Sequence, residues 1–242
     1  MKAPIVYTIL CLCILFGSAC EPEKPTVDAT DYQEQNNPKK NLDALEQEVA
    51  NNPESGIKED YINTNRVIWQ KPEVVIDFLG DISQKTVADI GAGTGFFAFR
   101  IARKAKKVIA IDIDQVFIDY LDSAKVMELP EADQPRLEPR FASPNDPNLK
   151  PGEADIIMMV NTYMWIPTER RIDYIKKLYN ALPENGKLLI LDFKKKRTPV
   201  GPDQAQRVPL FEAEIELEQA GFRKIETNDK ALDYQYVVIA QK

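Results

Sequence analysis

The chain has 242 residues, 44% of them hydrophobic, which is enough for one α/β domain with a sizeable core and additional N-terminal sequence. Its formal net charge of −7 argues against a duplex nucleic acid as partner, because such a partner calls for a basic surface. The sequence has no histidine, the commonest general base near neutral pH, and no cysteine pair at metal-site spacing, so we expect no metal.

The first twenty residues have the features of an export signal. Lys2 supplies a positive charge, residues 5–16 form an apolar run, and small residues at 17–19 precede Cys20. The run is too short to span a bilayer comfortably and fits a signal-peptide core. The ending resembles a bacterial lipoprotein signal, which implies a signal peptide over residues 1–19 and a lipid group on Cys20 that anchors the protein in the cell envelope. An ordinary secretory signal, or an uncleaved anchor with the domain facing the cytosol, is the alternative.

Residues 20–59 have the composition of a flexible tether. They are rich in Pro, Asn, Gln, Glu and Lys and poor in large apolar residues, so they cannot bury a core of their own. We expect a single folded domain over residues 60–242. Its first clear helix begins at Pro72, because the fixed φ of proline suits the first helical position.

The most informative segment joins a strand at 86–89 to a helix at 96–105 through three glycines spaced two apart, Gly91, Gly93 and Gly95. Glycine reaches positive φ without steric cost and lets a ligand approach the backbone where a Cβ would collide. A second strand, 107–111, ends at Asp112, and a carboxylate about twenty residues beyond such glycines suits the ribose of a nucleoside. The segment predicts a nucleoside-type cofactor; a tight turn without a ligand is the alternative.

The remaining elements alternate helices with strands. The apolar run 154–160 is typical of a strand buried on both faces in a parallel sheet. The last two strands are joined by only a few residues, which permits an antiparallel pair alone, because a parallel crossover needs a dozen residues or more. The expected helices are 115–125, 168–182 and 210–220, and the other expected strands are 137–142, 187–193, 224–227 and 236–240.

Asp89, together with the glycines and Asp112, makes the chain resemble the class I S-adenosylmethionine-dependent methyltransferases. A dinucleotide-binding fingerprint fits less well, since its third glycine would stand at Phe96 and Asp89 would repel a pyrophosphate. The resemblance implies, from about Arg66 onward, a Rossmann-like doubly wound α/β sheet of seven strands in the order 3-2-1-4-5-7-6, with strand 7 antiparallel. It also implies S-adenosyl-L-methionine as cofactor, bound beyond the carboxyl ends of the first and fourth strands.

The resemblance places the cofactor on residues from several loops. Asp89 is expected to hold the ammonium of the methionine moiety, and Asp112 the ribose. An acid or amide after the third strand is expected to hold the adenine, with Asp146 favoured over Asn145 and an Asx turn or helix cap as the alternative. The full expected set is Asp89, Gly91, Ala92, Gly93, Gly95, Asp112, Ile113, Asn145, Asp146 and Asn161.

Two further segments are candidates for the acceptor side of the site. Met164 and Trp165 follow the fourth strand, where related enzymes often carry histidines, and they form either a substrate wall or part of the core. Tyr61, Arg66 and Trp69 precede the first helix. They form either a lid over the cofactor or a cap on the outside of the sheet.

A catalytic base is needed only for an acceptor that must lose its proton early. Methyl transfer from a sulfonium is an in-line displacement, for which the protein chiefly aligns the acceptor and excludes water. With no histidine available, the candidates are Tyr163, after the fourth strand, and Asp192, at the end of the fifth.

Three functions are compatible with these features. The leading hypothesis is a methyltransferase that acts on a small-molecule or lipid-like acceptor. The alternative is a membrane-anchored protein that binds the same cofactor without turnover, since an export signal would carry the domain away from the cytosol, where the cofactor is made. A nicotinamide-dependent oxidoreductase is disfavoured by the glycine spacing. The basic run 194–197 is either a solvated loop or an attractor for an acidic acceptor.

Overall fold

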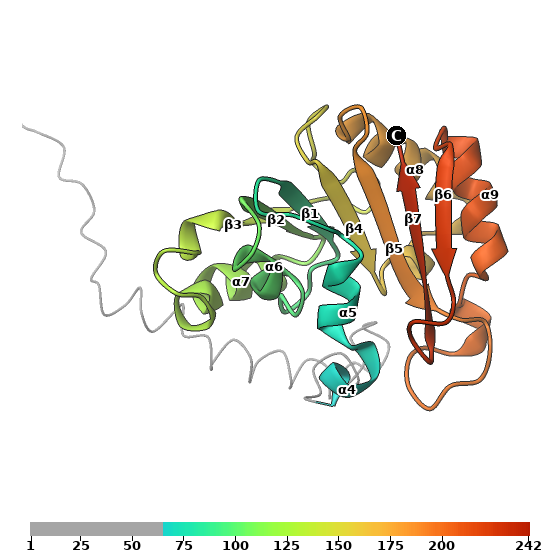
Figure 1. Ribbon diagram of the computed structural model, residues 1–242, viewed down its shortest axis with the longest axis horizontal. Coiled ribbons are helices and arrows are strands. Elements are labelled where there is room, and N and C mark those ends of the chain that lie inside the picture. Colours follow the sequence, from blue (N-terminus) through green and yellow to red (C-terminus); the bar gives the residue numbers. More distant parts are fainter. Residues whose placement is uncertain (1–64) are drawn as a thin grey trace, which may run out of the picture. The chain divides into compact units, whose positions relative to one another are not determined.

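The computed structural model describes residues 65–242, which form a seven-stranded sheet in the order β3-β2-β1-β4-β5-β7-β6 (Figure 1). Strands β1 to β5 are parallel, and β7 runs antiparallel to both β5 and β6. The predicted strand order and the antiparallel seventh strand are therefore confirmed. The strands are β1 (Thr86–Ile90), β2 (Lys107–Asp112), β3 (Leu137–Phe141), β4 (Ile156–Val160), β5 (Lys187–Phe193), β6 (Lys224–Asn228) and β7 (Gln235–Gln241).

Helices pack on both faces of the sheet and create two hydrophobic cores. One core lies between the sheet and α5, α6 and α7, which are on the near side in Figure 1, and the other lies between the sheet and α8 and α9. The helices are α4 (Arg66–Gln70), α5 (Pro72–Asp77), α6 (Ala98–Ala102), α7 (Gln115–Glu128), α8 (Thr168–Ala181) and α9 (Leu210–Ala220), with short 3-10 turns η1 (Gln134–Arg136), η2 (Tyr163–Trp165) and η3 (Gln204–Gln206).

Strand β4 lies at the centre of the sheet and is buried along its whole length. Its residues alternate between the two cores: Ile156 and Met158 belong to the α5–α7 side, whereas Ile157 and Met159 belong to the α8–α9 side. This explains why the segment is continuously apolar, because each face of a parallel sheet is covered by helices. Truncation of one such side chain to alanine is expected to cost about 2–5 kcal/mol.

Local sequence signals set most helix ends. Pro72 is the first residue of α5, and Gly221, at φ 113°, closes α9 in the left-handed region. Helix α6 is shorter than predicted and begins at Ala98, because residues 91–97 complete the glycine turn before the chain becomes helical. Strand β7 extends to Gln235 because this residue pairs with Phe193 of β5.

The connection from β3 to β4 contains no helix in the described segment 142–155. Ion pairs link this connection to the neighbouring strands: Arg140 of β3 pairs with Glu153 (2.8 Å) and with Glu138, and Lys107 of β2 pairs with Glu138 (2.5 Å). The Arg140 hydrogen bond lowers the pKa of the Glu153 carboxyl to about 2. Both edge strands carry polar residues: β3 has Glu138 and Arg140 beside Pro139, which has no N–H, and β6 has several exposed polar residues.

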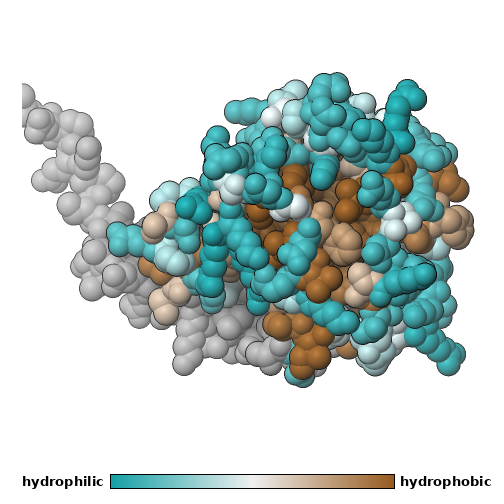
Figure 2. Space-filling view, viewed as in Figure 1, coloured by the Kyte–Doolittle hydropathy of each residue, from teal (hydrophilic) through white to brown (hydrophobic). Residues whose placement is uncertain are grey.

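The face drawn in Figure 2 is hydrophilic around its rim, and hydrophobic residues show at its centre, over α5 and the neighbouring strands. The carboxyl ends of β1 and β4 lie side by side in this sheet, because these strands pair in parallel with Ile90 opposite Met159. The strand order reverses at this pair, so the loops that follow it form the expected ligand position of a doubly wound sheet.

Candidate functional site

The turn after β1 is built on glycines in the left-handed region. Gly91 and Ala92 donate their amides to the Ile111 carbonyl at 2.8 and 3.0 Å, which fixes the turn over the end of β2. A Cβ on Gly91 would lie 2.3 Å from Oγ1 of Thr162, so packing alone demands glycine there. Gly93 differs, because a Cβ at its position would meet no atom within 4 Å. The backbone beside Gly93 is thus open to a ligand.

The Asp112 carboxylate joins the end of β2 to this turn. It accepts hydrogen bonds from the amide of Gly93 (2.8 Å) and from the amide of Asp114 (3.1 Å) and is only 8% exposed. Burial raises the pKa of the Asp112 carboxyl, while these backbone bonds oppose the increase. A carboxylate has about four lone-pair positions, so acceptor capacity remains for the hydroxyls of a ribose.

Asp89 is a buried acid without a direct partner. Its side chain is 2% exposed and makes no hydrogen bond or ion pair with the described residues. Burial raises the pKa of the Asp89 carboxyl to about 7; the positive charge of Arg66 lowers it and the negative charge of Asp112 raises it. A buried ionised acid is costly unless a cation pairs with it. The site therefore suits a ligand that brings a positive group.

These three features fit an adenosyl amino acid. The open backbone at Gly93 admits the ligand, and Asp112 offers acceptors for hydroxyl groups. Asp89 has no direct ion-pair partner among the described residues, and an α-ammonium would provide one. The structure brings these residues together at the ends of β1 and β2, where the sequence predicted them. Ile113, after Asp112, is 55% exposed beside the same turn.

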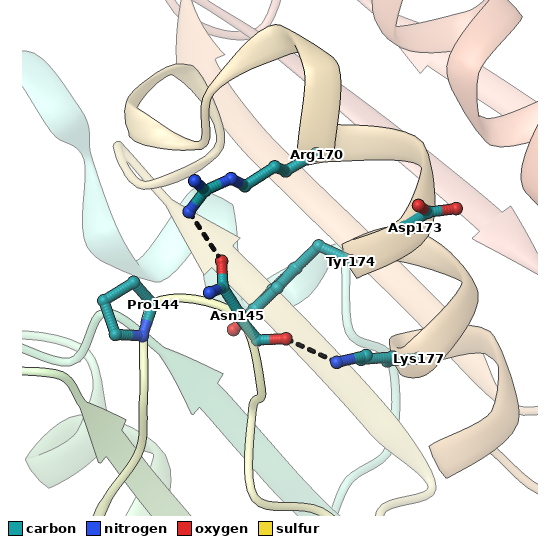
Figure 3. A pocket seen from close by; sticks show the side chains of 6 residues that line it. All are labelled: Pro144, Asn145, Arg170, Asp173, Tyr174 and Lys177. Atoms are coloured by element: carbon teal, nitrogen blue, oxygen red, sulfur yellow. Dashed lines mark hydrogen bonds between the residues drawn. The ribbon is translucent and has the colours of Figure 1, made fainter.

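The loop after β3 is held to α8 by polar contacts (Figure 3). Arg170 donates to the side-chain oxygen of Asn145 (2.9 Å), and Lys177 donates to its carbonyl (2.6 Å). A pocket of about 660 Å³ lies here, lined by Pro144, Asn145, Arg170, Asp173, Tyr174 and Lys177. Two side chains of α8 thus donate hydrogen bonds to Asn145.

Asp146 makes the Asx turn that was the alternative to a role in adenine binding. Its carboxylate accepts a hydrogen bond from the amide of Asn148 (2.9 Å), and its side chain is 63% exposed, 3.9 Å from the Lys177 ammonium. These contacts explain Asp146 through the loop alone, and its adenine-binding role stays a prediction.

Tyr163 is completely buried and bonded to Glu216. Its hydroxyl donates to the Glu216 carboxylate, which also pairs with Arg171 at 2.9 Å. Burial raises the pKa of the Tyr163 phenol, and the bond to Glu216 raises it further. A phenol in this state cannot take a proton from an acceptor near neutral pH. The geometry therefore argues against the predicted role of Tyr163 as a base.

Asp192 is also fully buried and bonded to backbone. Its carboxylate accepts the amides of Met164 (3.0 Å) and Phe193 (2.7 Å), which positions η2 against the end of β5. Burial raises the pKa of the Asp192 carboxyl to about 7. Both carboxylate oxygens of Asp192 accept backbone hydrogen bonds and its side chain is not exposed, so Asp192 supports the η2 turn. This geometry argues against its predicted catalytic role as well.

The predicted lid and wall residues divide between core and surface. Trp69 is buried and packs against Phe193, with ring centroids 5.6 Å apart, as expected of a cap on the sheet. The Arg66 guanidinium lies 4.2 Å from the ring centroid of Phe96 in the glycine turn. Met164 is buried, whereas Trp165 is 39% exposed. Tyr61 and Cys20 lie outside the described residues.

Two glutamines near the site carry no recognisable sequence signal. Gln70 accepts a hydrogen bond from Nε of Arg66 (2.6 Å) and donates to Gln235 (3.1 Å), and Gln235 in turn donates to the side-chain oxygen of Asn161 (2.5 Å). These four side chains, which we call the amide chain, join α4 to the end of β4. No sequence pattern could have linked residues 165 positions apart.

Comparison with known proteins finds similarity over part of the chain. Residues 87–186 match a family model described as a methyltransferase domain. A curated relative, ribosomal RNA small subunit methyltransferase A from Koribacter versatilis (strain Ellin345), is 43% identical over 47 residues, which is 19% of this chain and 16% of that protein. The chain therefore matches less than a quarter of the length of the curated relatives.

Solved structures are similar over most of the described chain. A SAM dependent methyltransferase from Aquifex aeolicus superposes with a TM-score of 0.65 at 24% identity, over 74% of this chain and 93% of that one. The [4+2]-cyclase SpnF superposes with a TM-score of 0.58 at 17% identity, over 72% and 80% of the two chains. The cofactor that the domain and its fold imply is S-adenosylmethionine. Residues 87–186 are thus similar to a methyltransferase domain, and the described residues have the same fold as the solved S-adenosylmethionine-dependent methyltransferase.

Proposed function

We propose that the protein is an S-adenosylmethionine-dependent methyltransferase that acts on a small-molecule or lipid-like acceptor. The observation that carries the proposal is the buried Asp89, which has no direct partner and stands at the start of an open glycine turn. Asp89 would hold the ammonium of the cofactor, the backbone at Gly93 would lie against it, and Asp112 would hold the ribose. Asn145, Asp146 and Ile113 would border the adenine.

When bound, the cofactor supplies an activated methyl group, so the residues of the chain mainly hold the reactants in line and keep water out. Tyr163 and Asp192 are both committed to structural hydrogen bonds. An acceptor that reacts without prior loss of a proton fits this arrangement best. The curated relatives are named for ribosomal RNA, but the net charge of −7 favours an acceptor other than a nucleic acid.

Calorimetry with S-adenosylhomocysteine tests the cofactor assignment. The wild-type protein is expected to bind it, and Asp112→Ala is expected to weaken binding by about 10-fold or more, because hydrogen bonds to a charged group are lost. Asp122→Ala removes an exposed acid from α7 and serves as the matched control. If a folded wild-type protein gives no heat of binding at high micromolar ligand, the proposal is wrong.

A binding protein without turnover is the second candidate. It is favoured by the structural roles of Tyr163 and Asp192, and the [4+2]-cyclase SpnF, which has a similar fold, is named for a reaction other than methyl transfer. Incubation with a cofactor labelled on its methyl group and with a cell lysate separates the two candidates. Transfer of label to any component supports the methyltransferase, whereas tight binding with no transfer supports the binding protein.

We also propose that the protein is anchored to a membrane of the bacterial cell envelope through a lipid on Cys20. The support comes from the apolar run and the small residues that precede Cys20 in the sequence. Within residues 65–242, no helix is long and apolar enough to cross a membrane. Incorporation of a labelled fatty acid into the wild type, with none into Cys20→Ser, is the expected result. Equal labelling of both would refute the lipid assignment.

A further inference from the structure

The amide chain has a fixed direction because it begins at an arginine. A guanidinium has only N–H donors, so Gln70 must turn its carbonyl oxygen toward Arg66. The NH₂ group of Gln70 then faces Gln235, which accepts it and presents its own NH₂ to Asn161. Each amide is oriented by the one before it, and the chain ends with the oxygen of Asn161 occupied.

The other end of the Asn161 amide is left without a partner. Asn161 is 7% exposed, and among the described residues its Nδ2 is the one side-chain nitrogen or oxygen that is fully shielded from solvent and makes no hydrogen bond. The remaining members of the chain are equally buried, at 8%, 0% and 1% exposed. A buried donor without an acceptor is destabilising, so its presence indicates an acceptor that a ligand supplies.

Asn161 stands where such a ligand is expected. It follows β4 directly and adopts a φ of 57°, a left-handed conformation that is uncommon for a residue other than glycine. The next residue, Thr162, packs against Gly91 of the glycine turn. Asn161 thus lies one strand from Asp89, at the paired ends of β1 and β4.

We propose that Arg66 sets the direction of the amide chain so that Asn161 presents an N–H donor to the carboxylate of the cofactor's amino-acid moiety. Gln70 and Gln235 are the positioning residues that transmit this direction. Asp89 and Asn161 then recognise the two opposite charges of one zwitterion, an acid for the ammonium and a donor for the carboxylate. This inference rests on the proposed function, since it requires the cofactor to bind here.

Two ligands test the proposal by calorimetry: S-adenosylhomocysteine, which has the amino-acid moiety, and 5′-methylthioadenosine, which lacks it. Asn161→Asp keeps the shape and still accepts from Gln235, but it turns an acceptor oxygen toward the ligand carboxylate. We expect S-adenosylhomocysteine to bind at least tenfold more weakly and 5′-methylthioadenosine to bind as in the wild type. Equal loss for both ligands, or no loss for either, overturns the proposal.

A second variant tests the transmission without touching Asn161. Gln70→Glu still accepts from Arg66 but cannot donate to Gln235, so the amides beyond it lose their imposed direction. We expect the same selective loss for S-adenosylhomocysteine, and Gln204→Glu, the same change on the exposed turn η3, should leave both affinities unchanged. A Gln70→Glu protein that binds S-adenosylhomocysteine as tightly as the wild type contradicts the role of the chain.

Two substitutions of Arg66 distinguish its effect on the direction of the amide chain from its effect on packing. Arg66→Lys keeps a group that can only donate and should retain most of the affinity, whereas Arg66→Gln can accept as well as donate and should show the selective loss. Thermal unfolding of each variant shows whether the fold is intact. A wild-type protein that binds neither ligand would refute the proposed function itself, whereas wild-type binding that no variant changes would refute only this inference.

Discussion

The amide of Gly93 donates a 2.8 Å hydrogen bond to the carboxylate of Asp112, which is 19 residues away in sequence. This bond joins the two segments that carry the cofactor prediction, the glycine turn after β1 and the acid at the end of β2. It fixes the open part of the turn relative to the acid. A ligand that contacts Asp112 therefore meets the backbone of Gly93 in a defined position.

Gly91→Ala should destabilise the protein strongly. The new Cβ would lie 2.3 Å from Thr162 Oγ1 in a backbone conformation that disfavours side chains, at a combined cost of about 2–5 kcal/mol. Urea denaturation measures the loss. Addition of Thr162→Ala should recover part of it by removing the steric conflict. A Gly91→Ala protein as stable as the wild type would show that the turn shifts freely.

Gly93→Ala should separate binding from stability. Its Cβ would point into open space, so the free energy of unfolding should fall only by the cost of a side chain at positive φ, about 1–2 kcal/mol. If that space receives the cofactor, S-adenosylhomocysteine should bind at least 10-fold more weakly, by about 1.4 kcal/mol or more. Calorimetry at a temperature where the variant is folded checks this. Unchanged affinity would place the ligand elsewhere.

Affinity for S-adenosylhomocysteine should rise with pH up to about 7 and then level off. The pKa of the Asp89 carboxyl is about 7 in the free protein, and an ammonium ligand favours its ionised form. Below pH 7 binding must therefore release a proton, and affinity should fall by up to about tenfold per pH unit. Asp89→Asn should bind weakly and lose this dependence. Titration of Asp112 would persist in that variant, which separates the two acids.

The same raised pKa makes the free protein less stable as pH increases. Between the ordinary pKa of an aspartate, near 3.8, and about 7, the folded state binds more protons than the unfolded state through Asp89 and Asp192. The free energy of unfolding should therefore decrease as pH rises through this window. Asp89→Asn should reduce the slope in urea titrations at several pH values. An unchanged slope would show that other groups control it.

Tyr163→Phe should affect stability and leave cofactor binding intact. The change removes the donor that Glu216 accepts inside the core, at an expected cost of about 1–3 kcal/mol. Denaturation measures this cost, and calorimetry with S-adenosylhomocysteine should give the wild-type affinity. If instead the variant is fully stable and methyl transfer to an identified acceptor stops, Tyr163 would regain its catalytic assignment.

Local signals in the sequence predict the glycine turn and the antiparallel last pair of strands, whereas the full sheet order is what the resemblance to the methyltransferases implies. Glycine spacing, the apolar runs and the short last connection each limit the chain to few arrangements. The sequence did not predict which side chains pack around the end of a strand. Tyr163 and Asp192 follow strands as catalytic residues do, but Glu216 in α9 and the Met164 amide occupy them. These contacts join distant segments, and no periodicity marks them.

The loop after β3 shows the same limit. Asp146 was chosen because it follows the third strand, and the sequence could not decide between a ligand contact and a turn. The choice depends on where the backbone of Asn148 lies, which only the folded loop shows. Gln70 and Gln235 carried no signal at all, since isolated glutamines in sequence are usually surface residues.

The polar edges of the sheet also govern how copies of the chain meet. A second sheet that approached β3 would find a proline ring without an N–H, next to Glu138 and Arg140, which are already paired with each other. The opposite edge, β6, presents Lys224 and Glu226. Strand-to-strand fusion of two copies is disfavoured at both borders. A high local concentration of the protein would then carry little risk of cross-β aggregation through these strands.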